Sequence, residues 1–192
     1  DARRHLPDGV KSVVTGNPIR SDFVTLDKAT ARAELGLDSR PLVLSFGGSL
    51  GAARINEAMA EVLRRSRAEG NLQHIHGAGK AGYTAMKAQL EEMGLPLSGD
   101  GITVREYIDD MPRCMAAADV VICRAGAMTL TEIARMGKAS IIIPSPNVAD
   151  NHQYKNAKAL SDEFAPADVE TILMNGNFSA MMPSICRATF VV

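Results

Sequence analysis

Short apolar, β-branched segments alternate with longer segments of helical periodicity along most of the chain. Between the short segments, apolar residues recur at spacings of three and four, as at Ile55, Met59, Val62 and Leu63. Repeated strand–helix–strand units require right-handed crossovers and a parallel sheet with helices on both faces. The sequence therefore predicts a doubly wound α/β fold, with strands over Ser12–Val14, Leu42–Phe46, Leu72–His76, Ile102–Arg105, Val120–Cys123 and Ser140–Ile143.

The charge balance narrows the classes of partner. The chain has 21 basic and 22 acidic residues, a formal net charge of −1, which argues against broad attraction to nucleic acid or to a membrane surface. Its three cysteines, Cys114, Cys123 and Cys186, have no metal-ligand spacing and fit a reducing, cytoplasmic compartment. No apolar run reaches the length of a membrane span. The absent initial methionine suggests a piece of a longer protein.

Two glycine-containing loops follow predicted strands. The first, "FGGSLGA" at residues 46–52, lacks the Gly-Lys-Ser/Thr ending of a P-loop and the spacing of a dinucleotide fingerprint. One interpretation is a tight turn that needs glycine for positive φ. The other is an anion site, in which backbone amides near Gly48 and the Ser49 hydroxyl contact phosphate or sugar oxygens.

The second loop, "CRAGAMTLTE" at residues 123–132, leads into a helix and also has two interpretations. Thr129 and Glu132 match a capping box, in which Glu132 only reaches back to the start of its own helix. Alternatively, the amides at the helix start hold an anion, because they have no partner within the helix. Glu132, leaning back toward the N-terminus, would then accept hydrogen bonds from a diol.

Two further loops carry polar residues at predicted helix starts. In "REYIDDMP", Asp109 and Asp110 before Pro112 are typical of a helix start rather than a metal site, while Tyr107 and Ile108 are candidates to pack on a flat base. In "PSPNVADNHQYKNA", Asp150 or Asn151 is the expected cap. His152 and Gln153 then fall in the first turn, where they suit sugar hydroxyls or act only as surface groups.

Taken together, "GNPIR", "SFGGSLGA", "REYIDDM", "CRAGAMTLTEI" and "DNHQYKNA" occur in the order and spacing of the carboxyl-terminal half of the MurG family, which the chain resembles over roughly residues 11–160. The family transfers N-acetylglucosamine (GlcNAc) from UDP-GlcNAc to lipid I, which makes lipid II for peptidoglycan. The resemblance implies the GT-B architecture of two Rossmann-like domains facing a cleft. Residues 1–160 would be the UDP-GlcNAc-binding domain and residues 161–192 an atypical C-terminal tail.

The resemblance also implies a role for each loop in binding the donor. Tyr107 and Ile108 would flank uracil, the helix start would hold the diphosphate, and Glu132 would hold the ribose diol. His152 and Gln153 would contact the GlcNAc hydroxyls, although some relatives have glutamine in place of His152. The remaining implied donor-binding positions are Arg20, Gly48, Ser49, Ala127, Met128 and Thr129.

The implied reaction is an inverting transfer in which the acceptor hydroxyl attacks the anomeric carbon and UDP leaves. It needs neither metal nor cofactor. The family's amino-terminal domain supplies the general-base candidate, the lipid I site and contact with the inner face of the plasma membrane, so we expect no catalytic residue in this chain. Two alternatives remain: a UDP-sugar-binding subunit that works with a separate membrane-bound acceptor subunit, and a relative of UDP-GlcNAc epimerases.

Overall fold

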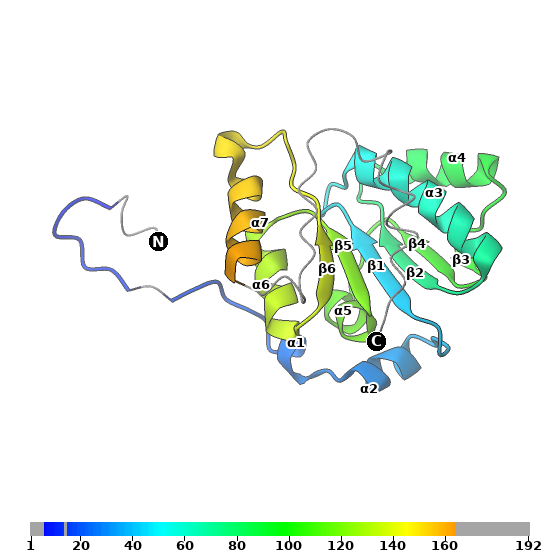
Figure 1. Ribbon diagram of the computed structural model, residues 1–192, viewed down its shortest axis with the longest axis horizontal. Helices are drawn as coiled ribbons and strands as arrows, with labels where there is room; N and C mark the ends of the chain where they lie inside the picture. Colours follow the sequence, from blue (N-terminus) through cyan, green and yellow to red (C-terminus); the bar gives the residue numbers. More distant parts are fainter. Residues whose placement is uncertain (1–5, 14, 164–192) are drawn as a thin grey trace.

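Five of the six segments predicted as strands join one sheet in the computed structural model, which describes residues 6–13 and 15–163 (Figure 1). They are β1 (Leu42–Phe46), β2 (Gln73–Gly77), β4 (Ile102–Arg105), β5 (Val120–Cys123) and β6 (Ala139–Ile142). The pairs β4–β2, β2–β1, β1–β5 and β5–β6 are all parallel. The prediction of a doubly wound parallel sheet is confirmed.

The predicted strand over Ser12–Val14 is wrong for the residues that the structure describes. Ser12 and Val13 belong to no strand, and 86% of the surface of Val13 is exposed; Val14 lies outside the described residues. In Figure 1 residues 6–13 extend away from the sheet. A β-branched run forms a strand only where a neighbouring strand can accept its backbone hydrogen bonds, which this segment does not reach.

A short strand that the sequence did not predict, β3 (Ser98–Gly99), pairs antiparallel with β4 at the edge of the sheet. The two residues between them, Asp100 and Gly101, have φ values of 51° and 80°. A two-residue hairpin turn of type I′ needs positive φ at both positions. With β3 included, the sheet order is β3-β4-β2-β1-β5-β6.

The connecting helices begin and end close to the predicted periodic segments. They are α1 (Asp22–Thr25), α2 (Lys28–Glu34), α3 (Ala53–Glu69), α4 (Tyr83–Glu92), α5 (Met111–Ala117), α6 (Ala127–Met136), the 3-10 turn η2 (Ala149–Asn151) and α7 (His152–Glu163). Helix α7 passes through residue 160, the expected end of the domain. The rest of the expected tail, residues 164–192, lies outside the described residues.

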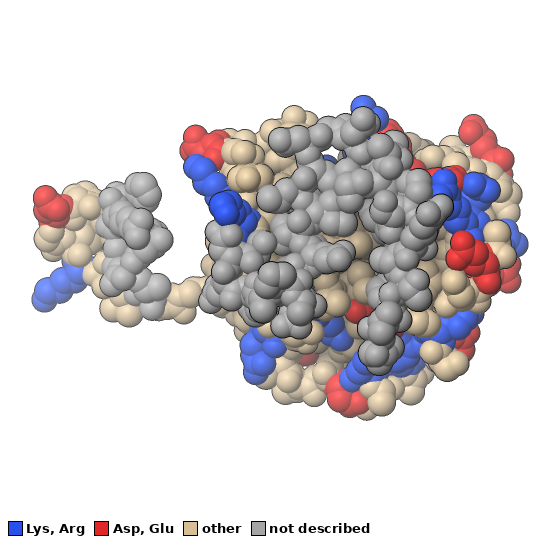
Figure 2. Space-filling model, in the orientation of Figure 1, with Lys and Arg blue, Asp and Glu red and all other residues tan. Residues whose placement is uncertain are grey.

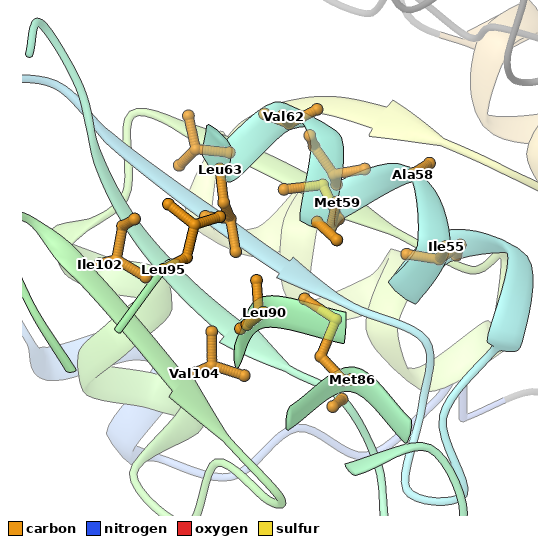
Figure 3. Close-up of a cluster of buried hydrophobic side chains, with 14 of the residues drawn as sticks. Ile55, Ala58, Met59, Val62, Leu63, Met86, Leu90, Leu95, Ile102 and Val104 are labelled. Atoms are coloured by element: carbon orange, nitrogen blue, oxygen red, sulfur yellow. The ribbon is translucent and has the colours of Figure 1, made fainter. Parts of the chain in front are cut away.

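Helices α3 and α4 cover one face of the sheet (Figure 3). Met59 and Leu63 of α3 and Met86 and Leu90 of α4 are at most 1% exposed and pack with strand residues such as Val104. Truncating a buried side chain of this size to alanine typically costs about 2–5 kcal/mol. The spacing of three and four in the sequence therefore identified the buried side of both helices.

The other face is covered by α1, α2 and α5, with α6 beside them. Phe23 of α1, Ala31 of α2 and Ile133 of α6 share one buried cluster with Leu42 and Leu44 of β1. A smaller cluster, made of Ala125, Leu130, Ile142 and Ala157, packs α6 against α7. Helix α6 is thus fixed on two sides, which holds its N-terminus at the carboxyl end of β5.

Charged residues lie on the outer surface, as the sequence predicts. Figure 2 shows Lys and Arg beside Asp and Glu around the visible rim of the molecule. On α3, Glu61 pairs with Arg64 and with Arg65 at 2.7 Å in each case, and Arg67 pairs with Asp100 at 2.9 Å. Such exposed pairs contribute little to stability, so their main effect is to keep this side of α3 in water.

Candidate functional site

The carboxyl ends of the five parallel strands lie in one row, at register partners Arg105, Gly77, Phe46, Cys123 and Ile142. From β1 the chain proceeds outward through β2 to β4, and then returns to β5 and β6 on the other side of β1 (Figure 1). The loops after β1 and β5 therefore leave the sheet at a topological switch point. Doubly wound sheets bind their ligands at this position.

The loop after β1, residues 47–52, is a tight turn that glycine makes possible. A Cβ atom on Gly47 would lie 2.5 Å from the Ala52 nitrogen, so no side chain fits there. Gly48 has a φ of 93° with open space beside it, and Gly51 has a φ of 86°. Gly48 and Ser49 are both exposed. The turn interpretation is confirmed, and the exposed Ser49 hydroxyl makes no hydrogen bond to another described residue.

The loop after β2, residues 78–82, supports this glycine-rich loop from the side. The amide of Lys80 donates to the Ser49 carbonyl, and the amide of Ala81 donates to the Leu50 carbonyl, both at 3.3 Å. A Cβ on Gly51 would lie 2.1 Å from the Ala78 carbonyl oxygen. The position of Ser49 therefore depends on the neighbouring strand as well as on its own loop.

Helix α6 begins at the carboxyl end of β5 without a side-chain cap. Its N-cap is Gly126, in extended conformation, and the first backbone bond into the helix runs from the Leu130 amide to the Gly126 carbonyl at 3.0 Å. The amides of Ala127, Met128 and Thr129 make no hydrogen bond to other described residues. Three unpaired N–H groups and the positive end of the helix dipole face the switch point, where they can bind an anion.

The capping-box interpretation of Thr129 and Glu132 is wrong. Because Gly126 is the cap, Thr129 lies in the first turn and Glu132 lies six residues beyond the cap. Within the described part of the chain, the Glu132 carboxylate accepts no hydrogen bond, and its side chain is half-buried. Glycine can occupy the N-cap as well as threonine does, so the sequence pattern alone could not choose between the two starts.

Burial raises the pKa of Glu132, which Arg20 opposes and Asp22 reinforces. Burial also raises the pKa of the Cys123 thiol to about 12, and the negative charge of Glu132 adds to this effect. Glu132 and Cys123, the last residue of β5, are therefore electrostatically coupled. A half-buried carboxylate without a donor is a poor structural element and a good acceptor for a ligand.

The "GNPIR" segment is attached to the first turns of α6. Asn17 donates from its side-chain amide to the Thr131 hydroxyl at 2.9 Å, and that hydroxyl donates to the Ala127 carbonyl at 2.8 Å. Arg20 follows, exposed, with its guanidinium 3.3 Å from the Asp22 carboxylate and 5.3 Å from the centre of the Phe23 ring. The segment therefore supplies a cation whose charge opposes the rise in the pKa of Glu132.

Tyr107 and Ile108, in the loop after β4, have different environments. Tyr107 is 56% exposed, whereas Ile108 is 4% exposed and packs in the core cluster with Phe46. The buried Ile108 side chain is not available to pack on a base. Of the predicted contacts, those of the Tyr107 side chain and of the Ile108 backbone remain available. Ile108 instead anchors the loop, because its side chain fills the space beside Gly77, where a Cβ would lie 3.0 Å away.

Asp109 and Asp110 mark the start of α5, as predicted. Asp110 is the N-cap residue, although its side chain makes no capping bond, and Pro112 lies in the first turn. The Asp110 carboxylate instead accepts a hydrogen bond from Arg105 at 2.7 Å. In the part of the chain that the structure describes, no three His, Cys, Asp or Glu residues are grouped to hold a metal ion.

His152 and Gln153 lie in the first turn of α7, as predicted, after Asp150 and Asn151, which both have a φ of 52°. The Gln153 side-chain oxygen accepts from the Ser145 amide at 2.9 Å, which leaves its NH₂ group as a donor. The His152 Nδ1–H donates to the Ala149 carbonyl at 2.9 Å, which leaves Nε2 as an acceptor. One donor and one acceptor therefore remain at this helix start.

Two residues that sequence reasoning missed connect the loops after β5 and β6. Arg124 donates to the carbonyls of Ile143 and Pro144 at 3.1 and 2.9 Å, and Asn156 donates to the Ala125 carbonyl at 3.1 Å. Burial lowers the pKa of Arg124. Nothing in the sequence shows that an arginine in a glycine-containing loop will bind carbonyls of the next strand. These bonds fix the start of α7 relative to the start of α6.

The arrangement has a helix start without a side-chain cap at its centre, followed along α6 by the half-buried Glu132, and an exposed tyrosine further along the row. Polar groups of α7 lie on the other side. At about 4.8 Å per strand, the ends of β4 and β6 are roughly 19 Å apart. An extended ligand with a flat ring, a central anion and a polar end fits this row.

No helix among the described residues is long and apolar enough to cross a membrane.

Comparison with known proteins gives a consistent result. The C-terminal domain of glycosyltransferase family 28 matches residues 42–173. The UDP-N-acetylglucosamine–N-acetylmuramyl-(pentapeptide) pyrophosphoryl-undecaprenol N-acetylglucosamine transferase of Acetivibrio thermocellus is 42% identical over 166 residues, which are 86% of this chain and 44% of the relative. The protein of the same name from Caldicellulosiruptor saccharolyticus is 39% identical over 160 residues, 83% of this chain and 42% of the relative. The chain thus spans less than half the length of these curated relatives.

Solved structures also resemble the chain. The crystal structure of MurG from Acinetobacter baumannii superposes with a TM-score of 0.59 at 27% identity, covering 95% of this chain and 49% of that one. The solution structure of ALG13 gives a TM-score of 0.53 at 16% identity, covering 80% of this chain and 86% of that one, which shows a shared fold.

Proposed function

The chain belongs to glycosyltransferase family 28 through the C-terminal domain of that family, and from this we propose that it binds UDP-GlcNAc as the donor half of an inverting transferase. The observation that carries the proposal is the start of α6, where three amides have no partner among the described residues and the same helix carries the half-buried Glu132 carboxylate, which accepts no hydrogen bond from those residues. The name that the relatives share includes N-acetylglucosamine transfer from a UDP sugar. The whole reaction, which makes lipid II from lipid I, is part of the proposal.

The diphosphate of the donor binds at the helix start. The amides of Ala127, Met128 and Thr129 donate to its oxygens, while the Ser49 hydroxyl and the backbone near Gly48 approach from the loop after β1. When the acceptor hydroxyl attacks the anomeric carbon, negative charge grows on the departing UDP. Donors fixed in advance stabilise that charge more in the transition state than in the ground state, which accelerates transfer.

The nucleoside binds on the side of the row toward β4. Glu132 accepts hydrogen bonds from the ribose diol, and Arg20 contacts the diphosphate or the facing wall of the cleft in the whole enzyme. Tyr107 packs on uracil while the backbone of Ile108 reads its edge. A carboxylate that recognises two adjacent hydroxyls favours ribose over deoxyribose, because a sugar that lacks one hydroxyl leaves part of the half-buried acceptor unpaired.

The sugar binds toward α7. The free NH₂ group of Gln153 donates to a GlcNAc hydroxyl and the free Nε2 of His152 accepts from another. This pairing explains why the first turn of α7 ends with one donor and one acceptor after its internal bonds are made. Neither a metal nor another cofactor has a role in the scheme, since the amides and Arg20 carry the interaction with the leaving group.

The acceptor and the general base belong to the part of the transferase that faces this domain in its longer relatives. We place lipid I and the contact with the inner face of the plasma membrane there, with the whole enzyme cytoplasmic and peripheral to the membrane. This chain by itself should bind the donor without completing transfer. Adding the amino-terminal half of a relative, together with lipid I, should restore transfer.

Calorimetry with UDP-GlcNAc, UDP and a dTDP sugar tests the proposal. We expect UDP and UDP-GlcNAc to bind and the dTDP sugar to bind more weakly, because it lacks the ribose 2′-hydroxyl and carries a methyl group on the base. Glu57→Ala, which removes an exposed glutamate from the outer side of α3, serves as a control and should leave the UDP affinity unchanged. Absence of binding by any uridine nucleotide would refute the proposal.

A further inference from the structure

A line of buried polar side chains crosses the apolar face between the sheet and α3. Ser45 of β1 and His76 of β2 are register partners, and both are fully buried. The Ser45 hydroxyl lies 2.8 Å from His76 Nδ1, and His76 Nε2 lies 3.1 Å from the Asn56 side-chain oxygen. The Asn56 amide nitrogen then donates to the Ala78 carbonyl at 2.9 Å. We call these four residues the Ser45–Ala78 chain.

The Ala78 carbonyl, the last member of the Ser45–Ala78 chain, determines the direction of every hydrogen bond in it. A carbonyl only accepts, so the Asn56 NH₂ group faces Ala78 and the Asn56 oxygen faces His76. His76 must therefore carry its proton on Nε2, which makes Nδ1 the acceptor for the Ser45 hydroxyl. Burial lowers the pKa of His76 to about 4, so the ring is neutral near pH 7. Each donor meets one acceptor.

The far end of the chain supports the glycine-rich loop of the site. Ala78 begins the loop after β2, and its carbonyl lies so close to Gly51 that a Cβ on that glycine would be 2.1 Å away. Two and three residues further on, the amides of Lys80 and Ala81 donate to the carbonyls of Ser49 and Leu50. A shift of the Ala78 peptide would therefore displace the segment that presents Ser49.

Helix α3 and strand β2 do not need these polar groups for packing alone. Their surroundings are apolar, and a well-packed apolar side chain is often as stabilising as a buried polar network. What the Ser45–Ala78 chain adds is a fixed position for the Ala78 carbonyl at the edge of the site. We propose that His76 and Asn56 are positioning residues, which hold the glycine-rich loop in the geometry that receives the diphosphate. This inference rests on the proposed function.

His74 provides a matched control on the same strand. It is 1% exposed, and its Nε2 lies 2.8 Å from the Ser66 hydroxyl of the same helix α3. Burial lowers its pKa to about 4 as well. Ser66 lies in the last turns of α3, away from the carboxyl ends of the strands, so the His74 contact leads to no site loop. Substitutions of the two histidines should cost similar stability and differ at the site.

The first readout is amide hydrogen exchange in the whole chain without ligand. His76→Leu should accelerate exchange of the Lys80 and Ala81 amides by about tenfold or more, whereas His74→Leu should leave both rates unchanged. His76→Gln, which can place an N–H donor toward the Asn56 oxygen, should restore most of the protection. Equal exchange rates at Lys80 and Ala81 in the two leucine variants would overturn the inference.

The second readout is UDP affinity at a temperature where the unfolding curves show each variant folded. His76→Leu should weaken UDP binding by about tenfold, and His74→Leu by less than twofold. If the unaltered chain binds no UDP, the proposed function fails, and the exchange rates alone then decide whether the Ser45–Ala78 chain positions the loop. Equal loss of UDP affinity in both leucine variants would make His76 merely structural.

Nitrogen chemical shifts of the histidine rings test the hydrogen bonds of the Ser45–Ala78 chain without any substitution. The account requires His76 to be neutral at pH 7 with its proton on Nε2. A proton on Nδ1 would reverse the bond to Ser45 and remove the donor to Asn56, so this result would also overturn the inference even if His76→Leu does not fold.

Discussion

Gly51 and Gly79 touch backbone to backbone across the loops that leave β1 and β2. A Cβ on Gly79 would lie 2.1 Å from the Gly51 nitrogen and 2.2 Å from its Cα, and both glycines have positive φ. The two loops can approach this closely only because neither residue has a side chain. The glycine-rich loop of the site is therefore built as part of a pair.

Gly79→Ala should lower the free energy of unfolding by more than about 3 kcal/mol, because the new methyl group overlaps backbone atoms that cannot move aside. Gly70→Ala is the control: Gly70 ends α3 with a φ of 67° and open space around it, so only the backbone strain remains. That strain should cost about 1 kcal/mol. Denaturant unfolding measures both values, and equal losses would mean that the loops can separate at little cost.

Thr129→Ala tests where α6 begins. With Gly126 as the N-cap, the substitution should change the free energy of unfolding by less than about 0.5 kcal/mol, because Thr129 makes no capping bond. A capping threonine would cost about 1 kcal/mol. Asp27→Ala is the positive control, since the Asp27 carboxylate accepts from the Thr30 amide at 2.9 Å and should lose stability measurably. A larger loss for Thr129→Ala than for Asp27→Ala would restore the capping box.

The start of α6 also shows what the sequence could and could not predict. Helical periodicity placed α3, α4 and α5 correctly, because buried positions such as Met59 and Leu90 must recur every three or four residues. The N-cap of α6 depends on the backbone conformation of Gly126. In the sequence, Thr129 and Glu132 form a capping-box pattern that competes with this start. The β3–β4 hairpin was missed for a related reason, since Ser98 and Gly99 have no apolar alternation to detect.

Stability should fall on acidification because of His74 and His76. Burial lowers the pKa of each from 6.5 to about 4, so the unfolded chain binds more protons than the folded chain between these values. The free energy of unfolding therefore decreases as pH falls from 6.5 to 4, by about 1.4 kcal/mol per pH unit for each histidine. His74→Leu should reduce this slope. An unchanged slope would mean that His74 remains protonated when folded.

Lys138 should make stability depend on pH in a second range, on the alkaline side. Its ammonium group donates to the carbonyls of Ala116 and Ala118 at 2.7 and 3.0 Å, and burial lowers its pKa to about 8. Between pH 8 and 10.5 the unfolded chain binds the extra proton, so stability should rise with pH over this range. Lys138→Met should flatten the rise in unfolding experiments. A rise of the same size in the variant would assign it to another group.

The site residues divide in the same way as the fold. Loops at the carboxyl ends of parallel strands were identifiable from pattern alone, and the structure brings the loops after β1, β5 and β6 to one edge as expected. The burial of Ile108 and the bonds of Arg124 and Asn156 were not predictable, because they depend on which backbone carbonyls and cavities the tertiary fold places nearby. Periodicity carries no information of that kind.

The central claim is that Glu132 holds the ribose of a diphosphate bound at the start of α6. The most direct measurement is calorimetric titration of the unaltered chain and of Glu132→Ala with UDP and with 2′-deoxy-UDP. Glu132→Ala should lose about 1.5–3 kcal/mol of UDP affinity, and removing the 2′-hydroxyl should weaken binding to the unaltered chain far more than to the variant. Equal UDP affinity of the two proteins would contradict the account.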